Sequence, residues 1–299
     1  MPPQSVNSIP KAPVVFASHG TPLTFCTESQ STDWWQKFGK SAMGNGVKGV
    51  VYICSHWQEL DGRIRVGTRK NPEVLQMDIV PRKYWENYPI NVSPELGRLV
   101  VSLLNDAGFP DVDEDPDAAW HDDTLTPSRW MFPEGTPPTT SVSINARYDP
   151  VFHVKVGKAL QPLRDMGIIV IGSGSIVHNL FRAAWLPFLL GGARKTIISG
   201  YKKEKWALEF ERAVRDTIEN NSGPRLAGTL IRLIEHPYYK LAHPSNDHFY
   251  PLLVIAGIVS DQNSEGTYGK KMAETWDMGN VCSSQYLWGD WIGQPKSET

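Results

Sequence analysis

The chain has few cysteines, no long apolar run and no excess of basic residues, and each shortage excludes a class of protein. Its three cysteines are odd in number and widely spaced, which excludes a disulfide framework and a CxxC metal site. The longest apolar stretch, at residues 251–259, is far shorter than the ~20 residues that a membrane helix needs. A net charge of −2 argues against a surface that binds nucleic acid.

The rest of the composition is that of an ordinary soluble domain. The chain has 299 residues, of which 40% are hydrophobic and 21% charged, enough for one large α/β domain or two small ones. No break in composition marks a boundary, so we predict a flexible tail at residues 1–12 and one domain at residues 13–299. The first ten residues lack the apolar core of a secretory signal, so a cytoplasmic location is expected. Monomer and small homo-oligomer both remain open.

Short apolar runs without apolar/polar alternation predict strands that are buried on both faces. Such strands are predicted at Val14–Ser18, Val50–Ser55 and Ile168–Ile171. Amphipathic stretches predict helices at Thr32–Phe38, Ser93–Ala107, 149–166, 201–220, and from Ser245 or Asn246 to Gly257. We interpret residues 109–140 as an extended loop, and residues 260–299 as poorly patterned with one strand near Tyr286–Trp288. Alternating strands and helices predict a three-layer α/β/α domain around a mostly buried mixed sheet.

Four of the eight histidines stand where a site is expected. His19, His56 and His178 each come at, or a few residues beyond, the end of a predicted buried strand, where open α/β sheets bind ligands. His248 lies in the first turn of the last predicted helix, whose positive N-terminus disfavours imidazolium and so favours the neutral, ligating form. The alternative is that each histidine is satisfied within its own turn, but three at one edge would require three coincidences.

The imidazoles alone leave the metal open. Imidazole suits Zn, Fe, Cu or Ni, and three histidines with an open position describe a hydrolytic zinc site as well as an oxygen-activating iron site. The residues alone therefore predict a mononuclear metal enzyme. His243 is interpreted as structural, and His153 and His236 are given no role.

The run Gly172-Ser173-Gly174-Ser175 is the other motif that needs an explanation. It lacks the GxGxxG spacing and the Walker lysine of nucleotide sites, and it lacks the GxSxG elbow of serine hydrolases. We interpret it as backbone that leaves room for a ligand close to the sheet edge.

Several motifs together resemble one known family. The motifs are Ser18-His19-Gly20-Thr21-Pro22, Ser55-His56-Trp57, Val177-His178-Asn179-Leu180 and Asp247-His248-Phe249-Tyr250-Pro251. In this order and at this spacing they resemble the class III extradiol ring-cleavage dioxygenases. They are most similar to the DOPA extradiol dioxygenase branch, which has members in plants, bacteria and fungi. The resemblance extends from about residue 13 to residue 259.

The resemblance implies a role for each of the four histidines. His19, His56 and His248 match the metal ligands of the family, and His178 matches its active-site base. It implies Fe(II) as the metal needed for activity, with Zn(II) able to occupy an all-histidine site in the purified protein. The substrates would be a small catechol and O2, and the ring would open next to the two hydroxyl-bearing carbons.

The chain departs from the family pattern in two loops. Where the family has Asp-His-Gly, this chain has Trp120-His121-Asp122-Asp123-Thr124, so His121 is a candidate active-site residue or else an exposed loop residue. The substrate loop of the family is replaced around Asp78-Ile79-Val80-Pro81. Two alternatives therefore remain: a zinc-dependent hydrolase that uses the same histidines, and a metal-binding or signalling relative that is not an enzyme.

Overall fold

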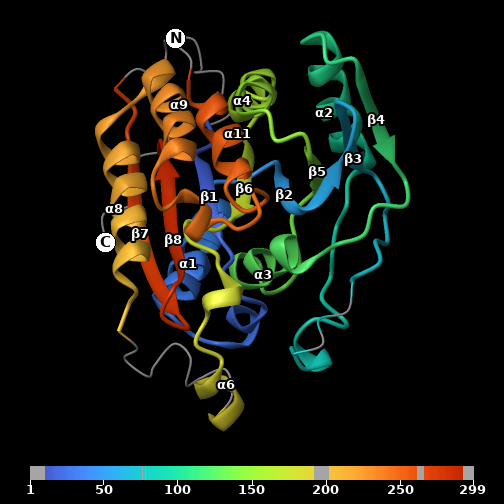
Figure 1. Cartoon of the computed structure of the whole chain (residues 1–299). Coiled ribbons are helices and arrows are strands. Elements are labelled where there is room, and N and C mark those ends of the chain that lie inside the picture. The colour runs from blue at the N-terminus through green and yellow to red at the C-terminus, as the bar shows by residue number, and fades with distance from the viewer. Residues whose placement is uncertain (1–10, 76, 78, 192–201, 261–265, 292–299) are drawn as a thin grey trace, which may run out of the picture.

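The chain folds around one eight-stranded sheet, shown in Figure 1. This computed structural model describes residues 11–75, 77, 79–191, 202–260 and 266–291. In spatial order the strands are β4 (Asp111–Asp115), β3 (Arg63–Gly67), β5 (Thr139–Asn145), β2 (Gly49–Glu59), β6 (Ile168–Gly174), β1 (Val14–Ser18), β8 (Val281–Trp288) and β7 (Gly269–Asp277).

The centre of the sheet is parallel and its flanks are mixed. β6 lies between β1 and β2 and is parallel to both, and β2 is also parallel to β5. β8 runs antiparallel to β1 and β7 antiparallel to β8, while β3 is antiparallel to β5. Parallel neighbours end at the same edge of a sheet, so β1, β2 and β6 all deliver their following residues to one place. The predicted α/β class with a buried mixed sheet is confirmed.

Helices cover both faces of this sheet. The longer ones are α1 (Gln30–Gly44), α2 (Pro94–Asp106), α3 (Asp122–Met131), α4 (Pro150–Ala159), α8 (Lys205–Asn220), α9 (Gly223–Arg232) and α11 (Tyr250–Ile258). The shorter ones are α5 (Pro162–Asp165), α6 (Leu186–Gly191) and α10 (Tyr239–Ala242), with 3-10 turns η1 (Pro22–Cys26), η2 (Arg82–Tyr84), η3 (Leu180–Arg182) and η4 (Leu233–Glu235). α2 begins as predicted: the Leu96 N–H donates to Ser93 Oγ at 3.1 Å, and Pro94 is the first helical residue.

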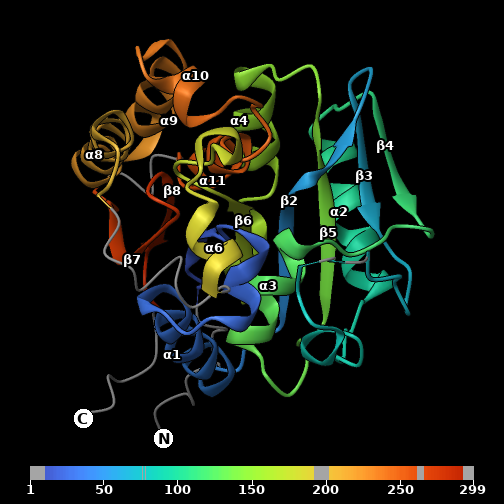
Figure 2. The same cartoon turned by 60° about the horizontal axis from the view of Figure 1, so that its bottom comes forward.

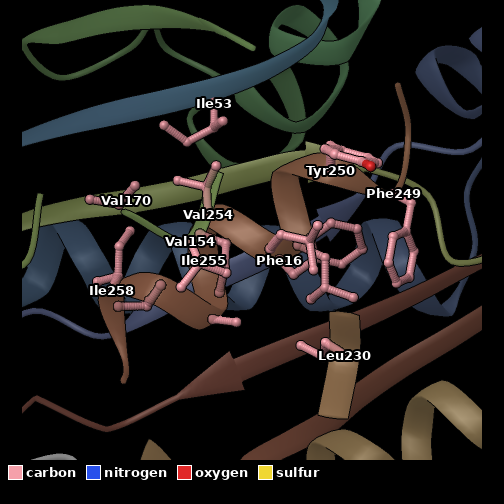
Figure 3. Close-up of a cluster of buried hydrophobic side chains, with 14 of the residues drawn as sticks. Phe16, Ile53, Val154, Val170, Leu230, Phe249, Tyr250, Val254, Ile255 and Ile258 are labelled. Carbon is pink, nitrogen blue, oxygen red and sulfur yellow. The ribbon is translucent and has the colours of Figure 1, made fainter. Parts of the chain in front are cut away.

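Alternate residues of each central strand belong to two separate cores. Val14 and Phe16 of β1 pack into the core formed with α2, α4, α8, α9 and α11, part of which Figure 3 shows. Val15 and Ala17 point to the opposite core, formed with α1 and α3. In Figure 2, α1 and α3 accordingly lie on the other side of the sheet from α4, α9 and α11. Two apolar faces explain why the strand sequences show no alternation.

α11 is held against α4 by two glycines. A Cβ on Gly157 of α4 would lie 1.9 Å from the Val254 carbonyl oxygen, and a Cβ on Gly257 would lie 2.1 Å from the Val154 carbonyl oxygen. The backbones of the two helices therefore touch, which no larger side chain allows. This contact holds α11 against α4, and His248 lies just before the first residues of α11.

Three longer segments differ from their predicted secondary structure, and the last helix also begins later than predicted, at Tyr250. Residues 109–140 are not an extended loop, because they contain β4, α3 and the start of β5. β4 was not predicted because its sequence is acidic, and α3 was not predicted because it contains Pro127. Residues 260–299 contain the hairpin of β7 and β8 rather than one late strand. The predicted helix 149–166 is broken into α4 and α5 at Leu160 and Gln161.

Two predicted segments, the N-terminal tail and the helix at residues 201–220, are only partly covered by the described residues. Residues 1–10 of the predicted tail and residue 201 of the predicted helix 201–220 lie outside the described residues. Within the predicted tail, Ala12 is buried and its N–H donates to the Arg164 carbonyl at 2.8 Å. In the part of the chain that the structure describes, no helix combines the length and the apolarity that crossing a bilayer requires.

Buried His153 gives stability a pH dependence of its own. The Asn145 N–H donates to His153 Nε2 at 3.1 Å, and His153 Nδ1 lies 2.7 Å from the Asp149 carbonyl oxygen, so the folded protein holds a neutral ring. Burial lowers the pKa of His153 to about 4, against its ordinary value near 6.5. Between these values the unfolded chain binds the proton and the folded chain does not. The contribution of His153 to the free energy of unfolding is therefore fully present above pH 6.5. It is lost as the pH falls toward 4, and the loss is up to about 3 kcal/mol.

We expect His153→Gln to flatten this dependence. Urea unfolding at pH 7 and at pH 4.5 should show a smaller loss of unfolding free energy for the variant than for the wild type. The variant itself will be less stable at pH 7, because it loses packing against Tyr250, so the comparison concerns only the change with pH. Equal changes in the two proteins would show that His153 does not carry the effect.

Candidate metal centre

Three histidines from distant parts of the chain meet at the sheet edge. His19, His56 and His248 each offer a ring nitrogen, and these three atoms lie within 4.8 Å of one another. Their ring centroids are separated by 5.0–5.3 Å. His19 and His248 are buried and His56 is partly exposed. The structure therefore brings together the three residues expected to ligate a metal.

The C-terminal hairpin fixes the loop that carries His19. The Gln285 side chain extends the β1–β8 pairing by one step, because its Oε1 accepts the Ser18 N–H at 3.0 Å and its Nε2 donates to the Ser18 carbonyl at 2.9 Å. The chain then turns at Gly20, whose φ of +70° suits glycine. A Cβ at Gly20 would also lie 2.4 Å from Ser283 Oγ. β8 thus sets where β1 ends and where His19 points.

His56 lies within β2 rather than after it. The strand continues to Glu59, but its register against β5 shifts between Cys54 and Gln58, and His56 falls in this irregular stretch. Such a bulge re-aims a side chain relative to the regular pleat. The Asp123 carboxylate holds the bulge, since its Oδ2 accepts the His56 N–H at 2.9 Å.

His248 precedes α11 instead of lying in its first turn, which corrects the prediction for this helix. α11 begins at Tyr250, with Phe249 as its N-cap. The His248 carbonyl accepts the Ser175 N–H at 3.0 Å, and a Cβ on Gly174 would lie 2.1 Å from the same oxygen. The space left by Gly174 at the sheet edge is therefore filled by the protein's own His248 loop, not by a ligand as the sequence suggested.

The geometry fits a bound metal ion. His56 Nε2 and His248 Nε2 lie 3.1 Å apart, close to the roughly 3.0–3.4 Å between two nitrogens that share one ion at about 2.1 Å. His19 Nε2 is buried and has no hydrogen-bond partner among the residues that the structure describes. A buried nitrogen without a partner is costly unless something binds it. Three imidazoles with ligating nitrogens this close suit a divalent transition metal.

Carboxylates contact the far side of two of these rings. Asp122 Oδ1 lies 2.7 Å from His56 Nδ1. Asp247 Oδ1 lies 3.0 Å from His248 Nδ1, and it accepts the His248 N–H at 3.0 Å. Sequence reasoning missed Asp122, and the only signal was its place beside His121. For Asp247 the signal in the sequence is its place directly before His248.

The pKa shifts follow from burial and from these carboxylates. Burial lowers the pKa of His19 and of His178, and the neighbouring histidines lower both further. Burial also acts to lower the pKa of His56, but Asp122 outweighs it and raises that pKa to about 9. Asp122 and Asp247 have lowered pKa values, because contacts with His56 and His248 outweigh burial. A carboxylate that favours a proton on His56 favours a metal ion there too, since both bring positive charge to the ring.

The two predicted catalytic histidines adjoin the triad. His178 stacks on His248 with ring centroids 3.7 Å apart and planes at 12°, and its ring is partly exposed. His121 is half-buried just before α3, with its ring centroid 6.0 Å from that of His56. His121 is therefore beside the site and not in an exposed loop. Their catalytic roles stay predictions.

The remaining histidines lie apart from the triad. His243 is buried, and its Nε2 lies 3.0 Å from the Ile176 carbonyl oxygen. Burial lowers its pKa to about 3, as expected of a structural histidine. His153 is fully engaged by the backbone, and the Tyr238 N–H donates to His236 Nδ1 at 3.2 Å.

Comparison with known proteins identifies the family that this arrangement resembles. Residues 11–282 match the family model described as the catalytic LigB subunit of aromatic ring-opening dioxygenase. The match includes His19, His56, His178 and His248 and covers nearly all of the chain.

Individual relatives agree with this match. The chain is 28% identical over 273 residues to a 4,5-DOPA dioxygenase extradiol of Beta vulgaris, covering 91% of this chain and 94% of that protein. It is 26% identical over 258 residues to the protein of the same name from Escherichia coli K12, covering 84% and 87%. The crystal structure of an uncharacterized Escherichia coli K12 protein has the same fold, with a TM-score of 0.73 at 23% identity over 93% of this chain and 99% of that one.

Proposed function

Because the chain belongs to the family of aromatic ring-opening dioxygenases that includes the catalytic LigB subunit, we propose that it opens a small catechol ring next to its two hydroxyl groups. The relatives named 4,5-DOPA dioxygenase extradiol support a DOPA-like substrate. The observation that carries the proposal is the convergence of His19, His56 and His248 on one point. Both atoms of O2 would enter the product, so no other co-substrate is needed.

We propose His19, His56 and His248 as the residues that hold the metal. When bound, Fe(II) would supply the redox chemistry that lets a catechol react with O2. The protein would contribute three ring nitrogens, one each from the residue after β1, from β2 and from the loop before α11. The same donors accept Zn(II), so the metal of a purified sample does not by itself define the active form.

His178 is proposed as the base that takes a catechol hydroxyl proton and returns it later in the reaction. Its ring lies against His248, so it would lie beside a bound metal, and it is not one of the three histidines whose ligating nitrogens converge. Imidazole can both accept and donate a proton near neutral pH. His121, on the His56 side, is proposed to contact the substrate or oxygen.

Oxygen consumption tests the proposed function. After anaerobic reconstitution with Fe(II), the protein should take up one O2 per catechol oxidised and form a yellow ring-fission product with at least one of DOPA, protocatechuate, caffeate or catechol. Protein reconstituted with Zn(II) is the matched control and should consume no O2. If no catechol supports uptake while the zinc form hydrolyses an ester or an amide, the hydrolase alternative replaces the dioxygenase.

A further inference from the structure

Two adjacent aspartates at the start of α3 reach two of the proposed ligands. The Asp122 carboxylate contacts His56 Nδ1, and the Asp123 carboxylate accepts the His56 N–H. The Asp123 main-chain carbonyl accepts a hydrogen bond from Ser173 Oγ of β6, and the same Oγ lies 3.1 Å from His19 Nδ1. One dipeptide therefore connects histidines that belong to β2 and to the end of β1.

Pro127 makes the Asp123 carbonyl available for this contact. In a regular helix the N–H of residue 127 would donate to the carbonyl of residue 123, four positions earlier. Pro127 lies inside α3 and has no N–H, so the Asp123 carbonyl lacks that helical partner. Ser173 Oγ takes its place. The proline that hid α3 from the sequence pattern thus provides the acceptor on which the Ser173 contact depends.

These contacts assign the proton of each ring. Ser173 gives its only hydrogen to Asp123, so its oxygen can only accept from His19, and His19 carries its proton on Nδ1. An ionised Asp122 also only accepts, so His56 carries its proton on Nδ1. When both rings are neutral, as ligation requires, the lone pair of each is on Nε2, the nitrogen needed to bind an ion. A histidine whose proton could move between its nitrogens would present this lone pair for only part of the time.

The carboxylates also match the charge of a divalent ion. The Asp122 and Asp247 side chains are only 12% and 14% exposed, and they lie behind the rings of His56 and His248. Two negative charges at this depth are costly without compensation. A divalent cation at the three nitrogens would offset both charges. A supporting carboxylate also makes the ligating imidazole a stronger donor.

We propose that Asp122 and Ser173 are positioning residues of the metal centre, which fix the ligating nitrogens of His56 and His19 and favour a divalent cation. The proposal rests on the proposed function, because it requires a metal at the three histidines. Neither residue is proposed to touch the substrate. Asp123 acts with them by holding the His56 backbone and by accepting from Ser173.

Cobalt titration of the full chain tests the proposal without using activity. Co(II) absorbs visible light in a way that depends on its ligands, so one titration gives both an affinity and a signature of the site. We expect Asp122→Asn and Ser173→Ala to weaken Co(II) binding about 10–100-fold and to alter its absorption bands. Asp33→Asn is the matched control, since Asp33 is an exposed aspartate in the first turn of α1. It should bind Co(II) as the wild type does.

The outcomes separate this proposal from the proposed function. If the wild type binds no Co(II), the metal centre itself is wrong. If the wild type binds and both variants match its affinity and spectrum, the positioning role is overturned and the proposed function stands. A lower unfolding temperature in Asp122→Asn with unchanged Co(II) affinity would reduce Asp122 to a helix-start residue. Should that variant not fold, Ser173→Ala, which removes one hydroxyl, decides alone, and unchanged binding overturns the proposal.

Discussion

His178→Ala should keep its metal and lose ring opening. His178 stacks on His248 but is not among the three nitrogens that converge, so its removal leaves the proposed ligands in place. Loss of a positioned acid-base group typically lowers the rate about 10²–10⁴-fold. We therefore expect kcat of the Fe(II) form to fall within this range while the bound metal stays near one ion per chain. Stopped-flow oxygen uptake and metal analysis of the same sample measure both.

Two further variants sharpen this result. His178→Gln keeps a polar side chain of similar reach but cannot act as a base, so it should be as slow as His178→Ala. His236→Ala is the matched histidine control, because His236 lies away from the triad and should retain full activity. A loss of metal in both His178 variants would make His178 a ligand and would remove it from the role of base.

The sequence predicted most of the central sheet because burial on both faces leaves a simple pattern. Val14–Ser18 is a strand with those bounds, and the apolar runs at residues 50 and 168 lie within β2 and β6. Elements at the margins of the sheet were missed because their sequences do not form simple apolar patterns. β4 is acidic and partly exposed at the edge, β7 carries charged residues along its length, and α3 contains a proline.

In the candidate site, too, the sequence predicted features that depend on a local pattern and missed those that depend on contacts between distant residues. His19 and His178 could be placed near the sheet edge by sequence alone, because each follows an apolar run, although β6 ends at Gly174 and not at the predicted Ile171. The bulge that turns His56 could not be placed, since it depends on the pairing of β2 with β5. The contacts made by Asp122, Ser173 and Gln285 join residues 50 to 267 positions apart, and no local pattern reports them.

Removing any one of the three proposed ligands should weaken metal binding more than any other substitution considered above. His56→Ala takes away one of three nitrogens and also leaves Asp122 buried without the ring that it contacts. An unpaired buried carboxylate is costly, so the variant loses affinity for the ion and also loses stability. We expect the metal Kd to rise well beyond the ~10–100-fold that a lost supporting contact costs. Metal content after dialysis against a weak chelator measures this.

His121→Ala is the matched control for this prediction. Its ring centroid lies 6.0 Å from that of His56, so it removes a neighbouring imidazole without removing a proposed ligand. His19→Ala, His56→Ala and His248→Ala should all emerge from dialysis without metal, and His121→Ala should retain it. If one of the three ligand variants retained its metal, that histidine would not be a ligand. If His121→Ala lost its metal, His121 would be a fourth ligand. Because the three proposed ligands come from the residue after β1, from β2 and from the loop before α11, equal loss in all three would show that the fold, and not one local motif, builds the centre.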